Sequence, residues 1–220
     1  MVDPAYSNAP LCRHLRFRKV KDVESWKATF HNPSTSPASY TKTLLVARPW
    51  AATAADVEEG GWVKTFSCVV HLEIDLRKAD ADPDQFVNCL VPFHGFSPAI
   101  KSPRLDYIPL PLPPILDLIH SFPLLEDLSV PDGIRREFEI DDGLDRQLNT
   151  LRTLGQPAFT GFLELCGVNL HATHLLSLPS GLRFRNLLLT LSNEVDISST
   201  ISLVESCCPT LKSLYIDFCS

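Results

Sequence analysis

The side chains that could carry chemistry in this sequence are its cysteines and histidines. The cysteines are Cys12, Cys68, Cys89, Cys166, Cys207, Cys208 and Cys219. No two of them have the C-x-x-C spacing of a zinc or redox pair, so we expect no metal site and no cofactor. Their number is odd, and the first 20 residues lack the apolar segment of a signal peptide. We therefore expect free thiols, packed as small apolar residues, in a protein of the cytoplasm or the nucleus.

Two groupings of cysteine and histidine would allow catalysis if the fold brought them together. Cys89 and His94 could form a thiol–imidazole pair, and His171 and His174 could share a helix face near Cys166. Proximity in the sequence does not establish either pair. A glycine-rich phosphate loop, a G-x-S-x-G motif and an H-E-x-x-H motif are all absent from the sequence. We therefore expect no enzymatic activity. The alternative, a hydrolase, would need a Cys/His pair in a shared cleft.

An acidic segment near 131–157 is the longest insertion in the chain. Its acidic residues are Asp132, Glu137, Glu139, Asp141, Asp142 and Asp145. Carboxylate-rich loops can bind calcium, but the EF-hand spacing of ligands is absent here. We therefore expect a solvated acidic insertion rather than a calcium site.

The overall charge excludes several classes of partner. The formal net charge is −6 and the sequence pI is near 5.6, whereas nucleic acids and anionic membranes select basic proteins. The most apolar segment, residues 107–119, is interrupted by four prolines and Asp117, so it does not predict a membrane span. We expect protein partners, with no nucleic acid and no membrane.

A recurring apolar-x-x-apolar-x-apolar pattern predicts the elements that position these side chains. The central and final positions of its eight copies are Leu15/Phe17, Leu44/Val46, Leu72/Ile74, Pro103/Leu105, Leu128/Val130, Leu163/Leu165, Leu187/Leu189 and Leu214/Ile216. Successive copies are 24–35 residues apart, a wider scatter than in a regular array, and their mean spacing lies near the upper part of the range for leucine-rich repeats. We therefore predict an α/β solenoid over residues 11–220, with a curved parallel sheet and helices on its convex side, after a flexible lead-in at residues 1–10. Neither end has an evident capping element, so we expect an uncapped solenoid whose core and edges are exposed, which indicates a fragment or a chain that needs a partner.

The segments between these strands predict helices and turns. Residues 113–130 give the clearest unit, in which a Pro pair opens a helix, Phe122-Pro123 closes it and a strand follows. Further helices are predicted at 21–32, at 51–66 with Gly60-Gly61 as its stop, at 79–93, at 142–155, at 171–179, and at 198–208 with a serine N-cap.

Proline marks several irregular positions in the chain. Pro103 replaces an expected leucine and removes a backbone donor, so we predict that the fourth strand is short or broken. Three Ser-Pro pairs, which begin at Ser36, Ser97 and Ser102, could be phosphorylated. We interpret the first two as loop positions and the third as the strand interruption.

Two sets of residues carry a family resemblance. The segment "CPTLKSLYIDFC", Cys208 to Cys219, resembles the cysteine-containing subclass of leucine-rich repeats. The segments "FHGFSPAIKS", "LDLIHSFPLLEDLSV", "PAFTGFLEL", "LLSLPSGLRFRNL" and "STISLVESCCPTLKSL" resemble fungal, basidiomycete-type F-box-like leucine-rich-repeat proteins, over roughly residues 85–217. The resemblance implies a region that selects substrates for a cullin-RING ubiquitin ligase. No L-P-x-E-[IV]-[IL]-type F-box stretch occurs in these 220 residues, so we expect contact with the ligase adaptor only if an F-box is supplied elsewhere.

The repeat register predicts which residues face the concave side of the sheet, because side chains alternate along a strand. The first column is Arg16, Leu45, Glu73, Arg104, Ser129, Glu164, Leu188 and Tyr215, and the second is Arg18, Ala47, Asp75, Asp106, Pro131, Cys166, Thr190 and Asp217. The candidate partner-binding residues are Arg16, Arg18, Glu73, Asp75, Arg104, Asp106, Ser129, Glu164, Leu188, Thr190, Tyr215 and Asp217. We interpret the face as a protein-binding surface of mixed charge, acidic toward its middle. Two alternatives stay open: these are solvated strand charges, or the chain is a structural or regulatory scaffold with no link to ubiquitin.

Overall fold

A computed structural model describes residues 13–32, 36–47, 61–75, 90–106, 112–131, 159–167, 175–176, 181–191 and 196–218. The expected lead-in at 1–10 and the helix at 142–155 lie outside the described residues. The acidic insertion near 131–157 also lies outside them, apart from its first residue, Pro131. Of the helix expected at 171–179, only Leu175 and Leu176 are described, and both are helical.

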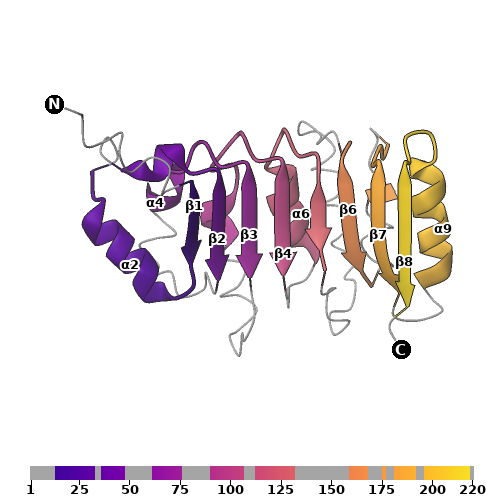
Figure 1. Cartoon of the computed structure of the whole chain (residues 1–220), viewed down its shortest axis with the longest axis horizontal. Helices are drawn as coiled ribbons and strands as arrows, with labels where there is room; N and C mark the ends of the chain where they lie inside the picture. Colours follow the sequence, from indigo (N-terminus) through magenta and orange to yellow (C-terminus); the bar gives the residue numbers. More distant parts are fainter. Residues whose placement is uncertain are drawn as a thin grey trace.

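The described residues form one open, all-parallel sheet in which the strands follow the order of the chain (Figure 1). The strands are β1 (His14–Phe17), β2 (Thr43–Ala47), β3 (His71–Asp75), β4 (Ser102–Asp106), β5 (Leu128–Val130), β6 (Phe162–Cys166), β7 (Asn186–Leu191) and β8 (Ser213–Phe218). This result confirms the α/β class and the parallel sheet. It also confirms the alignment of the eight copies, because the pairs Leu15↔Leu44 and Leu189↔Ile216 occupy the same register across the sheet.

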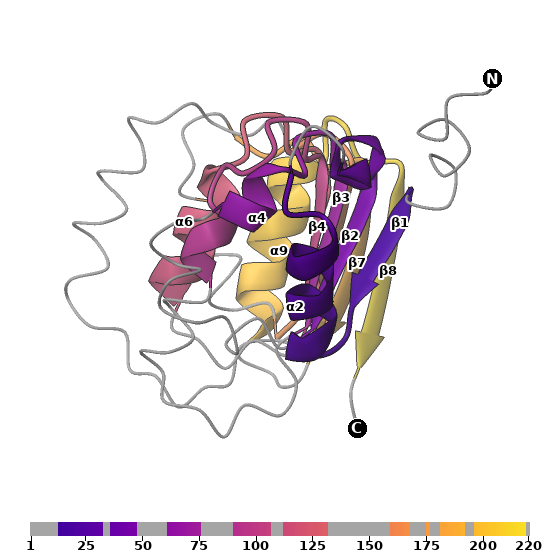
Figure 2. The same cartoon turned by 90° about the vertical axis from the view of Figure 1, so that its left-hand side faces the viewer.

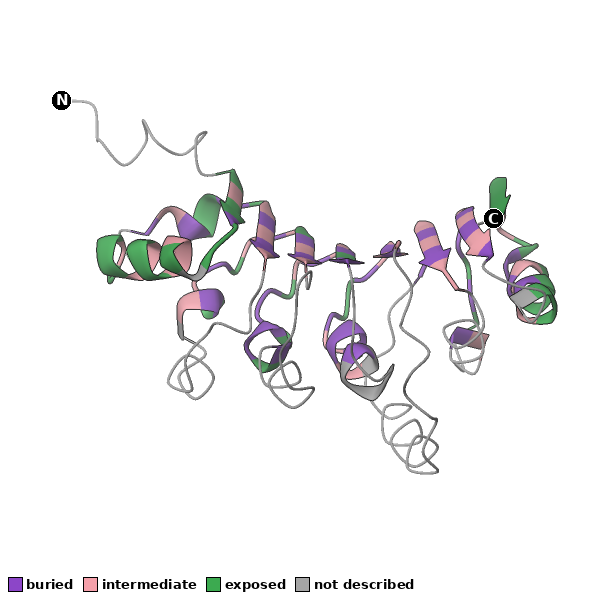
Figure 3. Cartoon of the chain, turned by 90° about the horizontal axis from the view of Figure 1, so that it is seen from below, coloured by how far each residue is buried: buried purple, intermediate pink, exposed green. Residues whose placement is uncertain are grey.

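Helical segments connect the strands, as parallel neighbours require. They are α2 (Val20–Thr29), η1 (Pro37–Tyr40), α4 (Gly61–Lys64), η3 (Val91–Phe93), α6 (Leu112–His120) and α9 (Asp196–Cys207). In Figures 2 and 3 the α-helices lie on one side of the sheet, which curves away from them. The opposite, concave side of the sheet is open in the described part of the chain, and we call it the open face.

Two helix predictions were wrong in their bounds. Gly61 begins α4 rather than ending a helix, and the burial of Val63 and Phe66 fixes this short turn against the core. α9 begins at Asp196, two residues before the predicted serine cap. Of the helix expected at 79–93, only 90–93 are described: Leu90 is helical, and the 3₁₀ turn η3 follows it, where Pro92 lacks the N–H of a regular helix.

The prediction that the fourth strand is short or broken was wrong, because β4 has five residues and pairs with β3 along its whole length. The effect of Pro103 appears instead in the pairing of β4 with β5, where Arg104↔Ser129 is the one pair formed. Successive residues of a parallel strand point their backbone groups alternately to the two neighbours. Because Ser102 N–H donates to Val70 O on the β3 side, the donor that Pro103 lacks would have faced β5.

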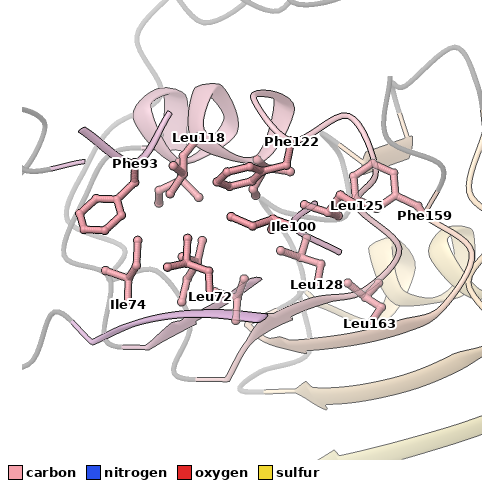
Figure 4. Close-up of a cluster of buried hydrophobic side chains, with 14 of the residues drawn as sticks. Leu72, Ile74, Phe93, Ile100, Leu118, Phe122, Leu125, Leu128, Phe159 and Leu163 are labelled. Atoms are coloured by element: carbon pink, nitrogen blue, oxygen red, sulfur yellow. The ribbon is translucent and has the colours of Figure 1, made fainter. Parts of the chain in front are cut away.

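The core lies between the sheet and the helical layer, and the alternating apolar residues of the strands form one of its walls. Leu72 and Ile74 of β3 point toward Phe93, Leu118 and other side chains of the helical layer (Figure 4). Each such leucine or isoleucine contributes about 1.5–3 kcal/mol when fully buried. The strand alternation therefore fixes both the core and, on the opposite side, the residues of the open face.

The predicted loop serines support this core. Ser97 is fully buried, and its Oγ donates to Ser67 O and Val69 O, both at 2.9 Å. Ser36 is also buried and accepts from Ala38 N–H at the start of η1. Both positions therefore have a structural role in the fold.

The N-terminal end of the sheet is covered on its helical side, although the sequence predicted no capping element there. Helix α2 contacts β1 at the N-terminal end of the sheet (Figure 1). Trp26 on this helix packs edge-on against Phe17 of β1 with ring centroids 5.7 Å apart, and Phe17 is 4% exposed. Asp22 anchors the helix start, because its carboxylate accepts from the backbone N–H groups of Arg18 and Lys19.

Candidate protein-binding face

The open face carries the predicted first column in unbroken register across the sheet. The paired positions run Arg16↔Leu45↔Glu73↔Arg104↔Ser129↔Glu164↔Leu188↔Tyr215. These side chains are intermediate or exposed, whereas their neighbours along strands β2 to β7 are buried. On β1 Leu15 is only partly buried, and on β8 every residue is exposed. The sequence therefore predicted this column correctly, residue by residue.

The second column is confirmed only in part. Asp75 and Asp106 are paired, and Cys166, Thr190 and Asp217 form a second paired set. Arg18 and Pro131 lie just outside β1 and β5 and belong to no strand register. The chain turns at Arg18 into α2, where its backbone N–H is bound by Asp22.

Five of the predicted residues meet at the centre of the open face, and we call them the charged cluster: Glu73, Arg104, Asp106, Ser129 and Glu164. Arg104 Nε lies 3.1 Å from Asp106 Oδ1, and its Nη1 lies 3.4 Å from Glu164 Oε2. Ser129 Oγ donates a short hydrogen bond to Glu164 Oε2. The guanidinium therefore joins strands β4 and β6 across β5.

The residues of the charged cluster differ in burial: Asp106 is buried, whereas Arg104 is accessible to a partner. Asp106 is 5% exposed, although the sequence placed it on an exposed surface. The Arg104 side chain is 46% exposed and that of Glu164 is 20% exposed. Arg104 can therefore contact a partner while the carboxylate beneath it holds its position.

The electrostatics of the charged cluster favour the charged form of Arg104 and disfavour the charged form of Glu73. Burial alone would lower the pKa of Arg104, but the hydrogen bond and charge of Asp106, together with Glu164 and Glu73, raise it. Burial and the negative charge of Asp106 raise the pKa of Glu73, against the opposing effect of Arg104 and Arg16. A positive group from a partner near Glu73 would favour the charged form of this carboxylate.

The remaining predicted residues lie away from the charged cluster. Leu188 and Thr190 on β7, with Tyr215 on β8, make the C-terminal part of the open face apolar or uncharged. Asp217 Oδ1 accepts the N–H of the next residue, Phe218. The open face is therefore charged over β3–β6 and more apolar toward β8.

A third column was missed by the sequence reasoning, and it precedes the apolar pair of each strand. Its paired members include His14, Thr43, His71 and Ser102, and farther along Phe162, Asn186 and Ser213. Asn186 Oδ1 accepts from Ser213 Oγ at 2.8 Å. The same two-residue alternation that predicted the other columns would have found this one.

Asp127, just before β5, connects three strands at this level of the sheet. Its Oδ2 accepts from Ser102 Oγ at 2.5 Å, and its Oδ1 accepts from Phe162 N–H at 2.7 Å. Beside it, Lys101 Nζ lies 2.6 Å from Glu126 Oε1. These contacts hold β4, β5 and β6 together at the point where Pro103 weakens the ladder.

The cysteines are free thiols where they are described, but they do not share one environment. Cys207 is fully buried, as predicted, and burial raises the pKa of its thiol. Cys68 and Cys166 are only partly buried, and Cys208 is exposed, so the prediction of buried thiols was wrong for Cys208. Cys89, His171 and His174 lie outside the described residues. Within the described part of the chain, no group of three or more Cys, His, Asp or Glu side chains could hold a metal ion.

Comparisons of this chain with protein-family models, with curated proteins and with solved structures found no match. No helix among the described residues is long and apolar enough to cross a membrane.

Proposed function

We propose that this chain is a non-catalytic protein-interaction module of the leucine-rich-repeat type, which binds a protein partner on the open face. The observation that carries the proposal is the unbroken column of partly exposed side chains from Arg16 to Tyr215, one from each strand. Stacked repeats give extended concave surfaces that suit the recognition of other proteins. The mean spacing between strands, near the upper part of the range for leucine-rich repeats, supports this repeat type, with a scatter of 24–35 residues that exceeds a regular array.

The side chains of the open face define the chemistry of the partner. Glu73 and Asp75 favour a basic side chain, and Arg104 presents a half-exposed guanidinium to a carboxylate. Leu188 and Tyr215 offer apolar contact area toward β8. A protein surface that combines both charges with an apolar residue fits this arrangement, and its association should weaken at high salt.

The resemblance to F-box-like proteins makes the partner a candidate substrate of a ubiquitin ligase. In that case the open face would select the substrate, and an F-box supplied elsewhere would contact the ligase adaptor. The free thiols and the net charge of −6 suit a cytoplasmic or nuclear protein that binds neither nucleic acid nor membrane.

Affinity capture from the native lysate under proteasome inhibition, followed by mass spectrometry, tests the proposal. The test variant replaces Glu73, Asp75 and Asp106 by their amides and Arg104 by Gln. The control variant E24Q/E205Q changes two exposed acids of α2 and α9, and it alters the formal net charge by the same two units. We expect the test variant to lose its partners and the control variant to keep them.

Circular dichroism of both variants shows whether the fold is intact, so that loss of partners is not loss of structure. Retention of every partner by a folded test variant would refute the open face as the binding surface. Ligase subunits among the captured proteins would support the ubiquitin link. Partners without any ligase subunit would instead favour a scaffold.

A further inference from the structure

The C-terminal edge of the sheet exposes an apolar strand. On β8, the exposed fractions are 43% for Leu214, 61% for Tyr215, 37% for Ile216 and 69% for Phe218. In the described part of the chain, β8 pairs with β7 alone. Edge strands of monomeric proteins are commonly protected by lysine, proline or a bulge, and Ser213–Phe218 contains neither lysine nor proline. The neighbouring helix α9 adds exposed Ile197 and Ile201 at the same end of the molecule (Figure 1).

The two edges of the sheet therefore differ. At the other edge, α2 lies on the helical side of β1, where its Trp26 packs against Phe17, and among the described residues the outer edge of β1 is uncovered (Figure 2). This edge is short and polar, since β1 has four residues and exposes His14 and Arg16. Charged side chains on an edge strand oppose pairing, so head-to-tail association of β8 with β1 is disfavoured and a symmetric contact between two β8 strands is left.

The backbone of β8 has the alternation that a symmetric antiparallel pair needs. Ser213 N–H donates to Arg185 O on the β7 side, at 3.1 Å. Because backbone groups alternate along a strand, the N–H and C=O groups of Leu214, Ile216 and Phe218 point to the open edge. Phe218 N–H agrees with this, since it is bound by the adjacent Asp217 side chain rather than by β7.

We propose that two copies of this chain associate through antiparallel pairing of β8 with β8 of the second copy, around a twofold axis at Ile216. In this register Ile216 pairs with itself, and Leu214 pairs with Phe218 of the second copy. All three residues direct their backbone groups to the edge, so the pair forms about four inter-chain hydrogen bonds, and about six once Asp217 releases the N–H of Phe218. The two sheets become continuous, and the helices of both copies stay on the same side.

The side chains are complementary in the same register. Leu214, Ile216 and Phe218 meet their counterparts on the helical side of the sheet, since their β7 partners Leu187, Leu189 and Leu191 point there. On the open face, Tyr215 lies opposite Asp217 of the second copy, where a phenol O–H can donate to a carboxylate. No like charges face each other in this arrangement.

The size of the contact indicates a weak dimer. The four apolar side chains of β8 each expose roughly 100 Å², given that an aromatic side chain buries about 150–250 Å² in full. Two copies together then bury about 800 Å² of side chain, and the backbones of both strands add to this area. The total lies near the lower bound of about 1,200 Å² for specific interfaces. We therefore expect the dimer to form reversibly, at micromolar concentrations or above.

Analytical ultracentrifugation of the whole chain, from about 1 to 100 µM, tests the dimer, because dissociation constants of weak interfaces fall in this range. We expect the mass to rise from 24.5 kDa toward twice that value. Phe218→Lys places a charge in the interface at a side chain that the monomer leaves exposed, and it should raise the dissociation constant by about tenfold or more. The control Leu124→Lys changes another exposed apolar residue, 52% exposed and distant from β8, and should alter the constant by less than about twofold.

Disulfide cross-linking determines the register of the two paired β8 strands. Directly opposed Ile216 residues have Cα atoms about 5.5 Å apart in a hydrogen-bonded pair, which suits a disulfide. Under mild oxidation Ile216→Cys should form a covalent dimer well above the background of the parent chain, whose Cys208 is exposed. Tyr215→Cys should not, because it lies opposite residue 217. A chain that is still monomeric at 100 µM would overturn the proposal, and the β8 edge would then be a site for a different protein. Equal cross-linking of the two variants would overturn the register.

Discussion

Removing the carboxylate of Asp127 should loosen three neighbouring strands at once. The side chain accepts from Ser102 Oγ of β4 and from Phe162 N–H of β6. Gly161 makes room for it, because a Cβ at residue 161 would lie 1.9 Å from Asp127 Oδ1. The backbone of Gly161 does not have a positive φ angle, so an alanine there is opposed by this contact and not by its own conformation.

The magnitude follows from the two hydrogen bonds. A hydrogen bond to a charged group contributes about 1.5–3 kcal/mol, and the partial exposure of Asp127 favours the lower value for each. Asp127→Ala should therefore lower the free energy of unfolding by about 3 kcal/mol. Gly161→Ala should cost about the same, since it forces the carboxylate away and breaks the same two bonds.

The double variant shows whether these two costs are one effect. With the carboxylate absent, the alanine at residue 161 meets mainly Glu126 O, at 3.2 Å. We expect the double variant to lose about 3–4 kcal/mol rather than 6, which is a coupling energy of about 2–3 kcal/mol. Urea unfolding at pH 7 measures all three variants, and the slope with denaturant should stay constant.

Asp127→Asn is the matched control for the charge. The amide keeps Oδ1 as an acceptor for Phe162 N–H, and its NH2 group replaces Oδ2, so Ser102 Oγ must turn to accept instead of donating; we expect a cost of about 1 kcal/mol. Additive costs of Asp127→Ala and Gly161→Ala, within about 0.5 kcal/mol, would show that Gly161 is not required by the carboxylate and would refute this reasoning.

Four further predictions concern the core, the strand ladder and pH. Phe66→Ala should lower the free energy of unfolding by about 3–5 kcal/mol in urea, because this fully buried ring packs against three other aromatic rings. Pro103→Leu should give an amide at residue 103 that is protected from hydrogen exchange, since this N–H faces β5. The gained hydrogen bond stabilises the folded state, but loss of the proline makes the unfolded chain more flexible, so the free energy of unfolding should change by less than about 0.5 kcal/mol. Burial and Asp106 raise the pKa of Glu73, so the folded state holds this proton more tightly than the unfolded chain and loses stability as pH rises through that range. Glu73→Gln should therefore stabilise the protein at pH 7, by about 0.5 kcal/mol, but not at about pH 3, where thermal unfolding provides the comparison. Burial lowers the pKa of His120 against the opposing charge of Asp117, so stability should fall as pH decreases from about 7.5 to 5.5, and His120→Gln should reduce that dependence.

The strands and their register could be predicted from the sequence because a single rule determines both. An apolar residue at every second position fits only one face of a sheet, so Leu72 and Ile74 had to point inward and Glu73 outward. Aligning the copies then aligned Glu73 with Arg104 and Leu188 with Tyr215. Local patterns do not determine how far a helix extends, which is why the start of α9 and the role of Gly61 were missed.

The contacts within the open face were harder to predict because they join residues distant in the chain. The bond between Arg104 and Glu164 spans 60 positions, and its formation depends on the short β5 between them. The burial of Asp106 likewise depends on how Arg104 lies over it. Asp127 was overlooked because it precedes its strand, although its position matches the first residue of neighbouring strands.

Site-specific photo-cross-linking tests the central proposal, that partners bind the open face, most directly. A photoreactive residue replaces Leu45 or Leu188 on the open face, or Val91 or Leu124, exposed apolar positions outside the strands, as controls. After irradiation in native lysate, we expect one shared set of cross-linked proteins from Leu45 and Leu188 and none of that set from Val91 or Leu124. Cross-links of that set from Val91 or Leu124, with none from the two open-face positions, would contradict the proposal.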